Sequence, residues 1–143
     1  MKTRRFLLLL PLLLAVVLVA GCKYQSPKQK AAAYLTTEIQ KANKLMAGKY
    51  VDDITLCDAV LFNGKDVVYN FTYDEVRAQM TIRDFAETPQ KDALDINLQL
   101  TWATNPSMAA LKKLVKTLGG MIIYNYTGSQ TGEGFTITID PED

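Results

Sequence analysis

The dipeptide Asn63-Gly64 lies between two runs rich in β-branched and aromatic residues, and it constrains the fold more than any other feature of this sequence. An Asn-Gly pair in this setting predicts a two-residue type I′ turn that joins two antiparallel strands. Phe62 then faces Lys65, and one face of the hairpin is apolar except at Asp58. We expect Asp58 to bond to a neighbouring hydroxyl group or to be turned outward by a β-bulge. The predicted pairs on that face are Val60 with Val67, Asp58 with Tyr69, Leu56 with Phe71 and Ile54 with Tyr73.

Three segments predict helices, because each has a capping residue directly before a proline at the first helical position: Ser26-Pro27, Thr88-Pro89 and Asn105-Pro106. The first helix begins with a capping box between Ser26 and Gln29, and Gly48 ends it. Its apolar stripe consists of Ala32, Leu35, Ile39, Ala42 and Met46. The last helix spans residues 106–118 and ends at Gly119-Gly120.

Residues 94–103 fit two structures. Apolar and polar side chains alternate from Asp95 to Trp102, as in a strand, but Leu94, Leu98 and Trp102 also recur at helical spacing. The Thr-Pro start favours a helix over about residues 89–103.

Residues 121–127 and 135–140 predict two further strands with a flexible glycine-rich loop, 128–134, between them. The order α-ββ-αα-ββ then predicts a two-layer α+β domain, in which helices cover one face of a four-stranded antiparallel sheet. Val-Val-Tyr-Asn-Phe-Thr at 67–72 resembles Ile-Ile-Tyr-Asn-Tyr-Thr at 122–127. One segment ends a hairpin and the other begins one, so we interpret them as two similar sheet strands rather than as a repeat.

The N-terminal segment combines basic residues at 2, 4 and 5 with an uncharged apolar run over 6–20. This run is too short to span a bilayer comfortably, since a spanning helix needs about 20 apolar residues. It ends in Val19-Ala20-Gly21-Cys22, which resembles the lipobox of bacterial lipoproteins. The resemblance implies that residues 1–21 are a signal peptide and that Cys22 is lipidated and then acylated at its new amino terminus. The alternatives are an ordinary signal peptide and an N-terminal anchor helix.

The same resemblance implies a place in the cell. Residue 23 is Lys rather than the Asp that tends to retain enterobacterial lipoproteins at the inner membrane, so the outer membrane is favoured, on its periplasmic face; the inner membrane and the cell surface are the alternatives. Residues 22–25 form a short lipidated tether, and residues 26–143 form a single domain. Removal of the leader leaves 13 basic and 15 acidic side chains, a net charge of −2.

Seven lysines lie on the predicted polar faces of helices: Lys28, Lys30, Lys41, Lys44, Lys112, Lys113 and Lys116. Such faces are ordinarily solvated, but a closely tethered domain can also turn them toward anionic headgroups. The near-neutral total charge gives no reason to expect a nucleic-acid partner.

The residue inventory points away from catalysis. The chain contains no histidine, which removes the commonest general base and the usual imidazole ligands of zinc. Cys57 is the one thiol besides Cys22, and its predicted strand neighbours offer no base to activate it. The acidic pairs, such as Asp52-Asp53, lack the spacing of a calcium loop. We therefore expect a protein that is not an enzyme and that takes no metal and no cofactor.

Aromatic side chains are the candidates for partner binding: Trp102, Tyr124 and Tyr126. Tyrosine and tryptophan are enriched at interfaces, but they are equally ordinary members of sheets and cores. Both roles remain open for these three residues at the level of sequence.

The order of elements after Cys22 is similar to that of Vibrio-type pilotins, the small lipoproteins that carry secretin subunits to the outer membrane. The shared features are the helix, the hairpin, Asn105-Pro106 with its helix, Gly120, Ile123-Tyr124 and a Thr-Gly loop before the last strand. This resemblance implies an assembly partner in the envelope. Pilotins of that type carry a disulfide pair that this chain lacks, and Trp102 and Ala103 fall where one of its cysteines is expected.

Two functions follow from these observations. The first is a membrane-anchored, non-catalytic binding or assembly module, and the pilotin resemblance belongs to it. The alternative is an envelope inhibitor or exclusion protein that blocks a lytic enzyme, a toxin or a phage, with the loop 128–134 as the blocking element.

Cys22→Ser tests the anchor. We expect wild-type protein expressed in its bacterium to incorporate a palmitate analogue and to sediment with membranes, whereas the variant does neither, since no thiol is left in the lipobox. Cys57→Ser is the matched control and retains both properties. Normal membrane retention of the Cys22 variant would contradict the anchor.

Overall fold

Five strands form one sheet in the computed structural model, which describes residues 25–143. They lie side by side in the order of the sequence: β1 (Lys49–Tyr50), β2 (Thr55–Phe62), β3 (Val67–Tyr73), β4 (Ile122–Gly128) and β5 (Gly134–Ile139). Cys22 and the predicted signal peptide lie outside the described residues, so the anchor stays a prediction.

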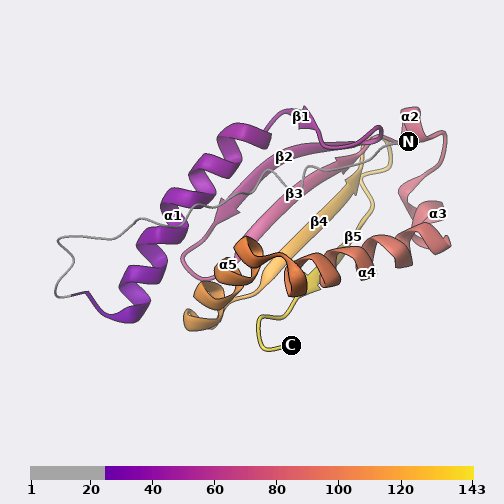
Figure 1. Ribbon diagram of the computed structural model, residues 1–143. Coiled ribbons are helices and arrows are strands. Elements are labelled where there is room, and N and C mark those ends of the chain that lie inside the picture. The colour runs from indigo at the N-terminus through magenta and orange to yellow at the C-terminus, as the bar shows by residue number, and fades with distance from the viewer. Residues whose placement is uncertain (1–24) are drawn as a thin grey trace.

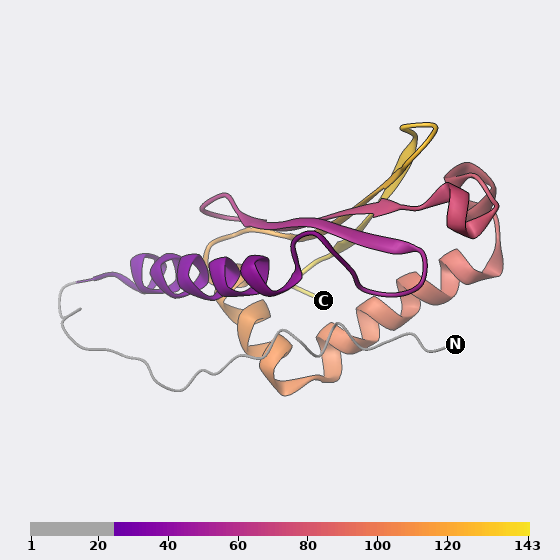
Figure 2. The same cartoon turned by 90° about the horizontal axis from the view of Figure 1, so that it is seen from above.

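Helices cover one face of this sheet (Figures 1 and 2). The three long helices α1 (Pro27–Met46), α4 (Pro89–Thr104) and α5 (Pro106–Thr117) form this second layer. Two short helices, α2 (Glu75–Ala78) and α3 (Ile82–Ala86), lie at one end of the sheet, after β3. The predicted α+β class is confirmed.

The predicted sheet of four antiparallel strands is wrong in strand number and in direction. The sheet is mixed, because β3 and β4 run parallel while all other neighbours run antiparallel. The chain between them returns along the helical layer through α4 and α5, so β4 begins at the end of the sheet where β3 begins (Figure 1). Such a crossover is what parallel neighbours require. The two-residue β1 and the helices α2 and α3 were not predicted.

The two similar segments are neighbours in the parallel pair, and each residue lies beside its counterpart. The rings of Tyr69 and Tyr124 stack with centroids 4.4 Å apart and planes 3° apart. On the opposite face, Asn125 Nδ2 donates to Asn70 Oδ1 at 3.0 Å. Equivalent positions in register meet the same surroundings, which accounts physically for the similarity of the two strands.

The connection between β2 and β3 is a four-residue loop, 63–66, and not the predicted two-residue turn. Asn63 Oδ1 accepts the backbone N–H groups of Lys65 at 3.0 Å and Asp66 at 2.7 Å. This side-chain turn competes with a tight I′ turn. Phe62 therefore pairs with Val67, and the predicted register is wrong by two residues beside the loop.

Asp58 is the extra residue of a β-bulge between Cys57 and Ala59. Its carboxylate is exposed and accepts the Thr72 hydroxyl at 2.7 Å, so both expected outcomes for this residue occur together. The bulge also changes which face of β2 is buried. Thr55 and Cys57 face the core, and the predicted inward position of Leu56 is wrong.

The predicted helix starts agree with the structure at all three prolines, and Ser26 and Asn105 cap their helices. The predicted cap at Thr88 is wrong, because its hydroxyl donates to the Phe85 carbonyl at 2.6 Å and accepts no N–H group of α4. Gln29 N–H donates to Ser26 Oγ at 3.1 Å and the Gln29 side chain accepts from Ser26 N–H at 2.9 Å, which completes the predicted capping box. The buried stripe of α1 contains Ala31 in place of the predicted Ala32. Residues 94–103 lie within α4, so the helical alternative was right, and α5 begins at Pro106 as predicted.

The hydrophobic core lies between the sheet and the long helices, and every member of its buried cluster lies between Leu35 and Ile139. At its centre, Trp102 Nε1 donates to the Tyr124 hydroxyl at 2.8 Å. The neighbouring Tyr69 hydroxyl is also buried, and burial together with Tyr124 raises the pKa of Tyr69. Within the described residues, the Tyr69 hydroxyl has only a weak polar contact with the Tyr124 hydroxyl and no well-formed hydrogen bond.

This difference predicts unequal losses of stability for two matched substitutions. Tyr124→Phe leaves the buried Trp102 N–H unpaired, so we expect the free energy of unfolding in urea to fall by about 1–3 kcal/mol. Tyr69→Phe removes only the weak contact with the Tyr124 hydroxyl, and we expect a change within about 0.5 kcal/mol. Equal losses for the two variants would show that the indole hydrogen bond does not stabilise the core.

Candidate binding site

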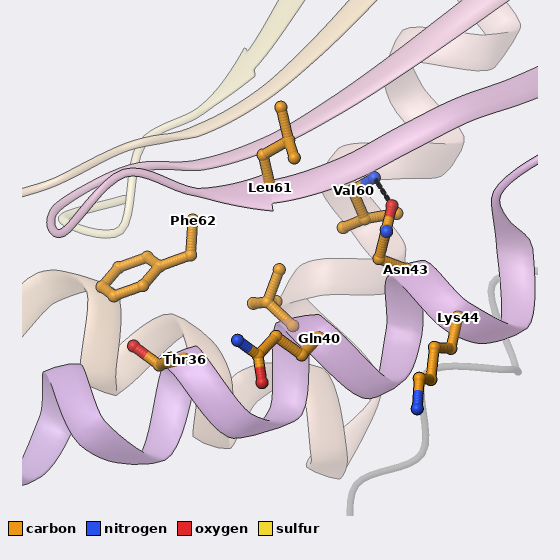
Figure 3. Close-up of a pocket in the computed structure, with 8 residues that line it drawn as sticks. Thr36, Gln40, Asn43, Lys44, Val60, Leu61 and Phe62 are labelled. Atoms are coloured by element: carbon orange, nitrogen blue, oxygen red, sulfur yellow. Dashed lines mark hydrogen bonds between the residues drawn. The ribbon is translucent and has the colours of Figure 1, made fainter.

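A groove of about 420 Å³ lies between α1 and β2 (Figure 3). Its apolar lining comes from Ile39 of α1 and from β2, where the Phe62 ring is directed toward the helix. Its polar lining comes from successive turns of α1, at Thr36, Gln40 and Asn43. The full lining set is Thr36, Ile39, Gln40, Asn43, Lys44, Val60, Leu61 and Phe62.

The groove exists because β2 has a strand partner along only part of its outer edge. β1 pairs with Cys57 and Leu56, and in the described part of the chain no strand continues this pairing past the bulge. The Val60 N–H points to this edge and donates to Asn43 Oδ1 of α1 at 2.7 Å. Alternate residues of a strand direct their backbone groups to the same edge, so Phe62 presents its N–H and C=O there too.

The chemical groups of the groove come from side chains of α1 and β2. The groove contains amide, hydroxyl and aliphatic groups, and no carboxylate or thiol belongs to its lining. In Figure 3 the Lys44 ammonium group is directed away from the strand. A groove with an apolar floor, polar margins and unpaired backbone groups suits an extended peptide segment.

The aromatic residues that the sequence offered for partner binding are all in the core. Trp102 and Tyr124 are 1% and 0% exposed, and Tyr126 is 6% exposed and stacks on Phe71 and Phe135. Side chains buried to this degree present no surface to a partner. We therefore assign all three to packing, and the groove takes their place as the candidate site.

Cys57 is buried between the sheet and the helices. Desolvation, with a smaller contribution from Asp58, raises the pKa of its thiol to about 11. A thiol with this pKa is protonated at neutral pH and is a poor nucleophile.

Sequence analysis missed Glu75, which is 6% exposed and holds the loop 129–133 in place. Its carboxylate accepts the backbone N–H groups of Gln130 at 2.6 Å, Thr131 at 2.8 Å and Ile82 at 2.7 Å, as well as the Thr131 hydroxyl. A side chain at Gly128 would collide with this carboxylate, since an added Cβ would lie 2.5 Å from Glu75 Oε2. The loop predicted to be flexible is therefore anchored, although its residues remain exposed.

The remaining acidic residues form no ligand set. Asp74 accepts the Tyr50 hydroxyl at 2.6 Å, and the Arg77 guanidinium lies 4.0 Å from the centroid of the Tyr50 ring. Within residues 25–143, no three acidic or cysteine side chains are grouped as a metal site. Over the same residues, no helix combines the length and apolar character needed to cross a bilayer.

Comparison with known proteins identifies a fold and nothing narrower. No family model and no curated protein matches this sequence. Among solved structures, PA3611 of Pseudomonas aeruginosa, a protein thought to be secreted, matches with a TM-score of 0.53 over 77% of this chain and 92% of that one. The two chains share a fold. They are 14% identical, so the likeness extends to the fold alone.

The Glu75 carboxylate should make the stability of the fold depend on pH in the acidic range. Desolvation raises its pKa, but the hydrogen bonds from Ile82, Thr131 and Gln130 outweigh this and lower the pKa from 4.5 to about 2. The carboxylate thus stabilises the fold above its unfolded pKa, and this stabilisation is lost as the pH falls from about 4.5 to about 2.

We expect Glu75→Gln to lower the melting temperature at pH 7 by about 10 °C. The variant should also lose the part of the acid-induced decline that belongs to this carboxylate, in thermal melts taken across that pH range. The exposed Glu87→Gln is the control and keeps the wild-type profile. An unchanged profile in the Glu75 variant would overturn the assignment.

Proposed function

We propose that this protein is an exported lipoprotein, anchored to the outer membrane through Cys22, that presents a non-catalytic binding module in the cell envelope. The lipobox-like segment supports the anchor. The shared fold with a protein thought to be secreted is consistent with export.

The observation that carries the binding function is the unpaired edge of β2 beside the groove. Strand edges present backbone donors and acceptors, and proteins usually cover them or use them to bind another chain. Here the Val60 N–H donates to Asn43 Oδ1, while no strand of the described residues pairs with Phe62 on that side.

The proposed partner is an envelope protein that adds an extended segment to this edge. Its backbone pairs with Phe62, and an apolar side chain enters the groove against Ile39 and Val60. A secretin segment is the partner that the resemblance to pilotins favours. Apart from Lys44, whose ammonium group is directed away from the strand, the polar lining consists of amide and hydroxyl side chains, so we expect selectivity for uncharged sequences.

The alternative function, an envelope inhibitor, is favoured by a different observation. The exposed loop 129–133 is held by Glu75 in one arrangement, and a preorganised protruding loop is what an inhibitor uses to occupy an enzyme. The target would then contact Gln130 and leave the groove empty.

Site-specific photo-cross-linking in the native envelope separates these functions. A cross-linking amino acid at Gln40 lies in the groove, one at Asn97 lies on the outer face of α4, and one at Gln130 lies in the anchored loop. We expect Gln40 to capture one envelope protein through an extended segment that Asn97 does not capture. Capture of a lytic enzyme at Gln130 would favour the inhibitor instead.

A bulky substitution provides a matched test of the groove. Gln40→Trp fills the groove, and we expect it to reduce recovery of the captured partner at least about ten-fold, while Asn97→Trp leaves recovery unchanged. Thermal melts establish that both variants are folded. Equal recovery from the two variants would exclude the groove as the binding site.

A further inference from the structure

We infer that the end of the domain from which the tether leaves is a membrane-facing surface that binds the anionic headgroups of the bilayer. This inference rests on the anchor proposed at Cys22. It goes beyond that anchor because it fixes which end of the domain faces the lipid and which side chains make the contact.

Three segments lie at this end of the molecule: the beginning of α1, the loop 63–66 and the C-terminal half of α5 (Figures 1 and 2). The described chain begins here at Gln25, and Cys22 lies three residues earlier in the sequence. Three residues reach at most about 10 Å. This reach is close to the Debye length of about 8 Å at physiological ionic strength, so charges at the beginning of α1 feel the potential of the bilayer. The loop and α5 lie behind the beginning of α1 on the same side of the molecule (Figure 2).

Each of the three segments carries an exposed lysine without an ion pair among the described residues. They are Lys28 and Lys30 of α1, Lys65 of the loop and Lys113 of α5. These four ammonium groups are free to meet phosphate groups.

Among the described residues, no ion pair joins the acidic C-terminal tail to these four lysines. Glu142 pairs with Lys116 at 3.5 Å, and the backbone carbonyl of Asp143 accepts from Lys112 Nζ at 3.5 Å. In the loop, Asp66 Oδ1 accepts the Met121 N–H at 2.8 Å and so connects the loop to the start of β4.

The opposite end of the molecule carries an excess of negative charge. It consists of α2, α3, the beginning of α4 and the β4–β5 loop (Figure 1). Its acidic residues are Asp74, Glu75, Asp84, Glu87, Asp92 and Glu133, against Arg77, Arg83 and Lys91. An anionic bilayer therefore attracts one end of the domain and repels the other, so it orients a domain whose total charge is slightly negative.

Lysine labelling on vesicles tests the orientation. Residues 22–143, which contain the whole core cluster, are coupled through Cys22 to a maleimide lipid in vesicles of phosphatidylcholine alone or with about 30% phosphatidylglycerol, a content chosen to give the surface potential that attracts lysines. The buried, protonated Cys57 does not compete for the maleimide. Because the anchor is attached chemically, the result is independent of whether cells lipidate Cys22, which the palmitate experiment tests separately.

We expect a water-soluble amine reagent, read by mass spectrometry, to label Lys28, Lys30, Lys65 and Lys113 several-fold more slowly on the anionic vesicles than on the neutral ones. Lys44, Lys49 and Lys91 should be labelled equally on both, and high salt should remove the difference. Equal labelling of the four lysines on both vesicles, or slower labelling of all seven, would overturn the inference.

A charge-matched pair of variants tests the contact itself, using residues 23–143 without a lipid. Each lysine near an anionic surface contributes about five-fold to binding, so replacing Lys28, Lys30, Lys65 and Lys113 by Gln should lower the partition onto anionic vesicles at low salt by about 100-fold or more. The control replaces Lys41, Lys44, Lys49 and Lys91 by Gln and makes the same change in net charge. Equal losses of vesicle binding in the two variants would show that binding depends only on net charge and would contradict a defined membrane-facing surface.

Discussion

The parallel pairing of β3 with β4 is the constraint on which the rest of the structure depends. It places Tyr69 on Tyr124 and Phe71 beside Tyr126, so that a continuous row of stacked rings forms the floor of the core. The Tyr124 hydroxyl then receives the Trp102 indole N–H and ties α4 to the sheet. The helical layer owes its place to the same pairing, since α4 and α5 carry the chain back to the start of β4.

Local signals in the sequence predicted the elements that local interactions determine. The caps at Ser26 and Asn105 and the stripe of α1 depend on residues within one or two helical turns, and they agree with the structure. Strand direction depends on contacts between residues 55 apart, and an alternating pattern fits either direction equally well. The hairpin register failed for a different reason. Asn63 can serve a tight turn through its backbone or a longer loop through its side chain, and the sequence is the same in both cases.

The candidate site was harder to predict, because its parts have no distinctive residue types. The groove depends on Asn43 meeting a backbone N–H seventeen residues later, and an amide at that helix position is ordinary surface composition. Glu75 looks like one acidic residue among many until the loop after β4 encloses it. Trp102 and Tyr124 were ambiguous because the same amphipathic side chains suit a core and an interface, and their burial and mutual hydrogen bond appear only in the folded chain.

The position of β4 so late in the chain has a consequence for how the molecule is made. Synthesis delivers α1 and the β2–β3 hairpin first, and a two-stranded hairpin is marginally stable by itself. Until residues 122–128 have been synthesised, β3 has no neighbouring strand on that side, and Tyr69, Phe71 and Tyr73 form an exposed, aggregation-prone apolar surface. The chain therefore gains its core in one late, non-local step, which is intrinsically slow. If the chain is exported as proposed above, this late step would leave the β2–β3 strands available to chaperones until β4 and β5 are in place.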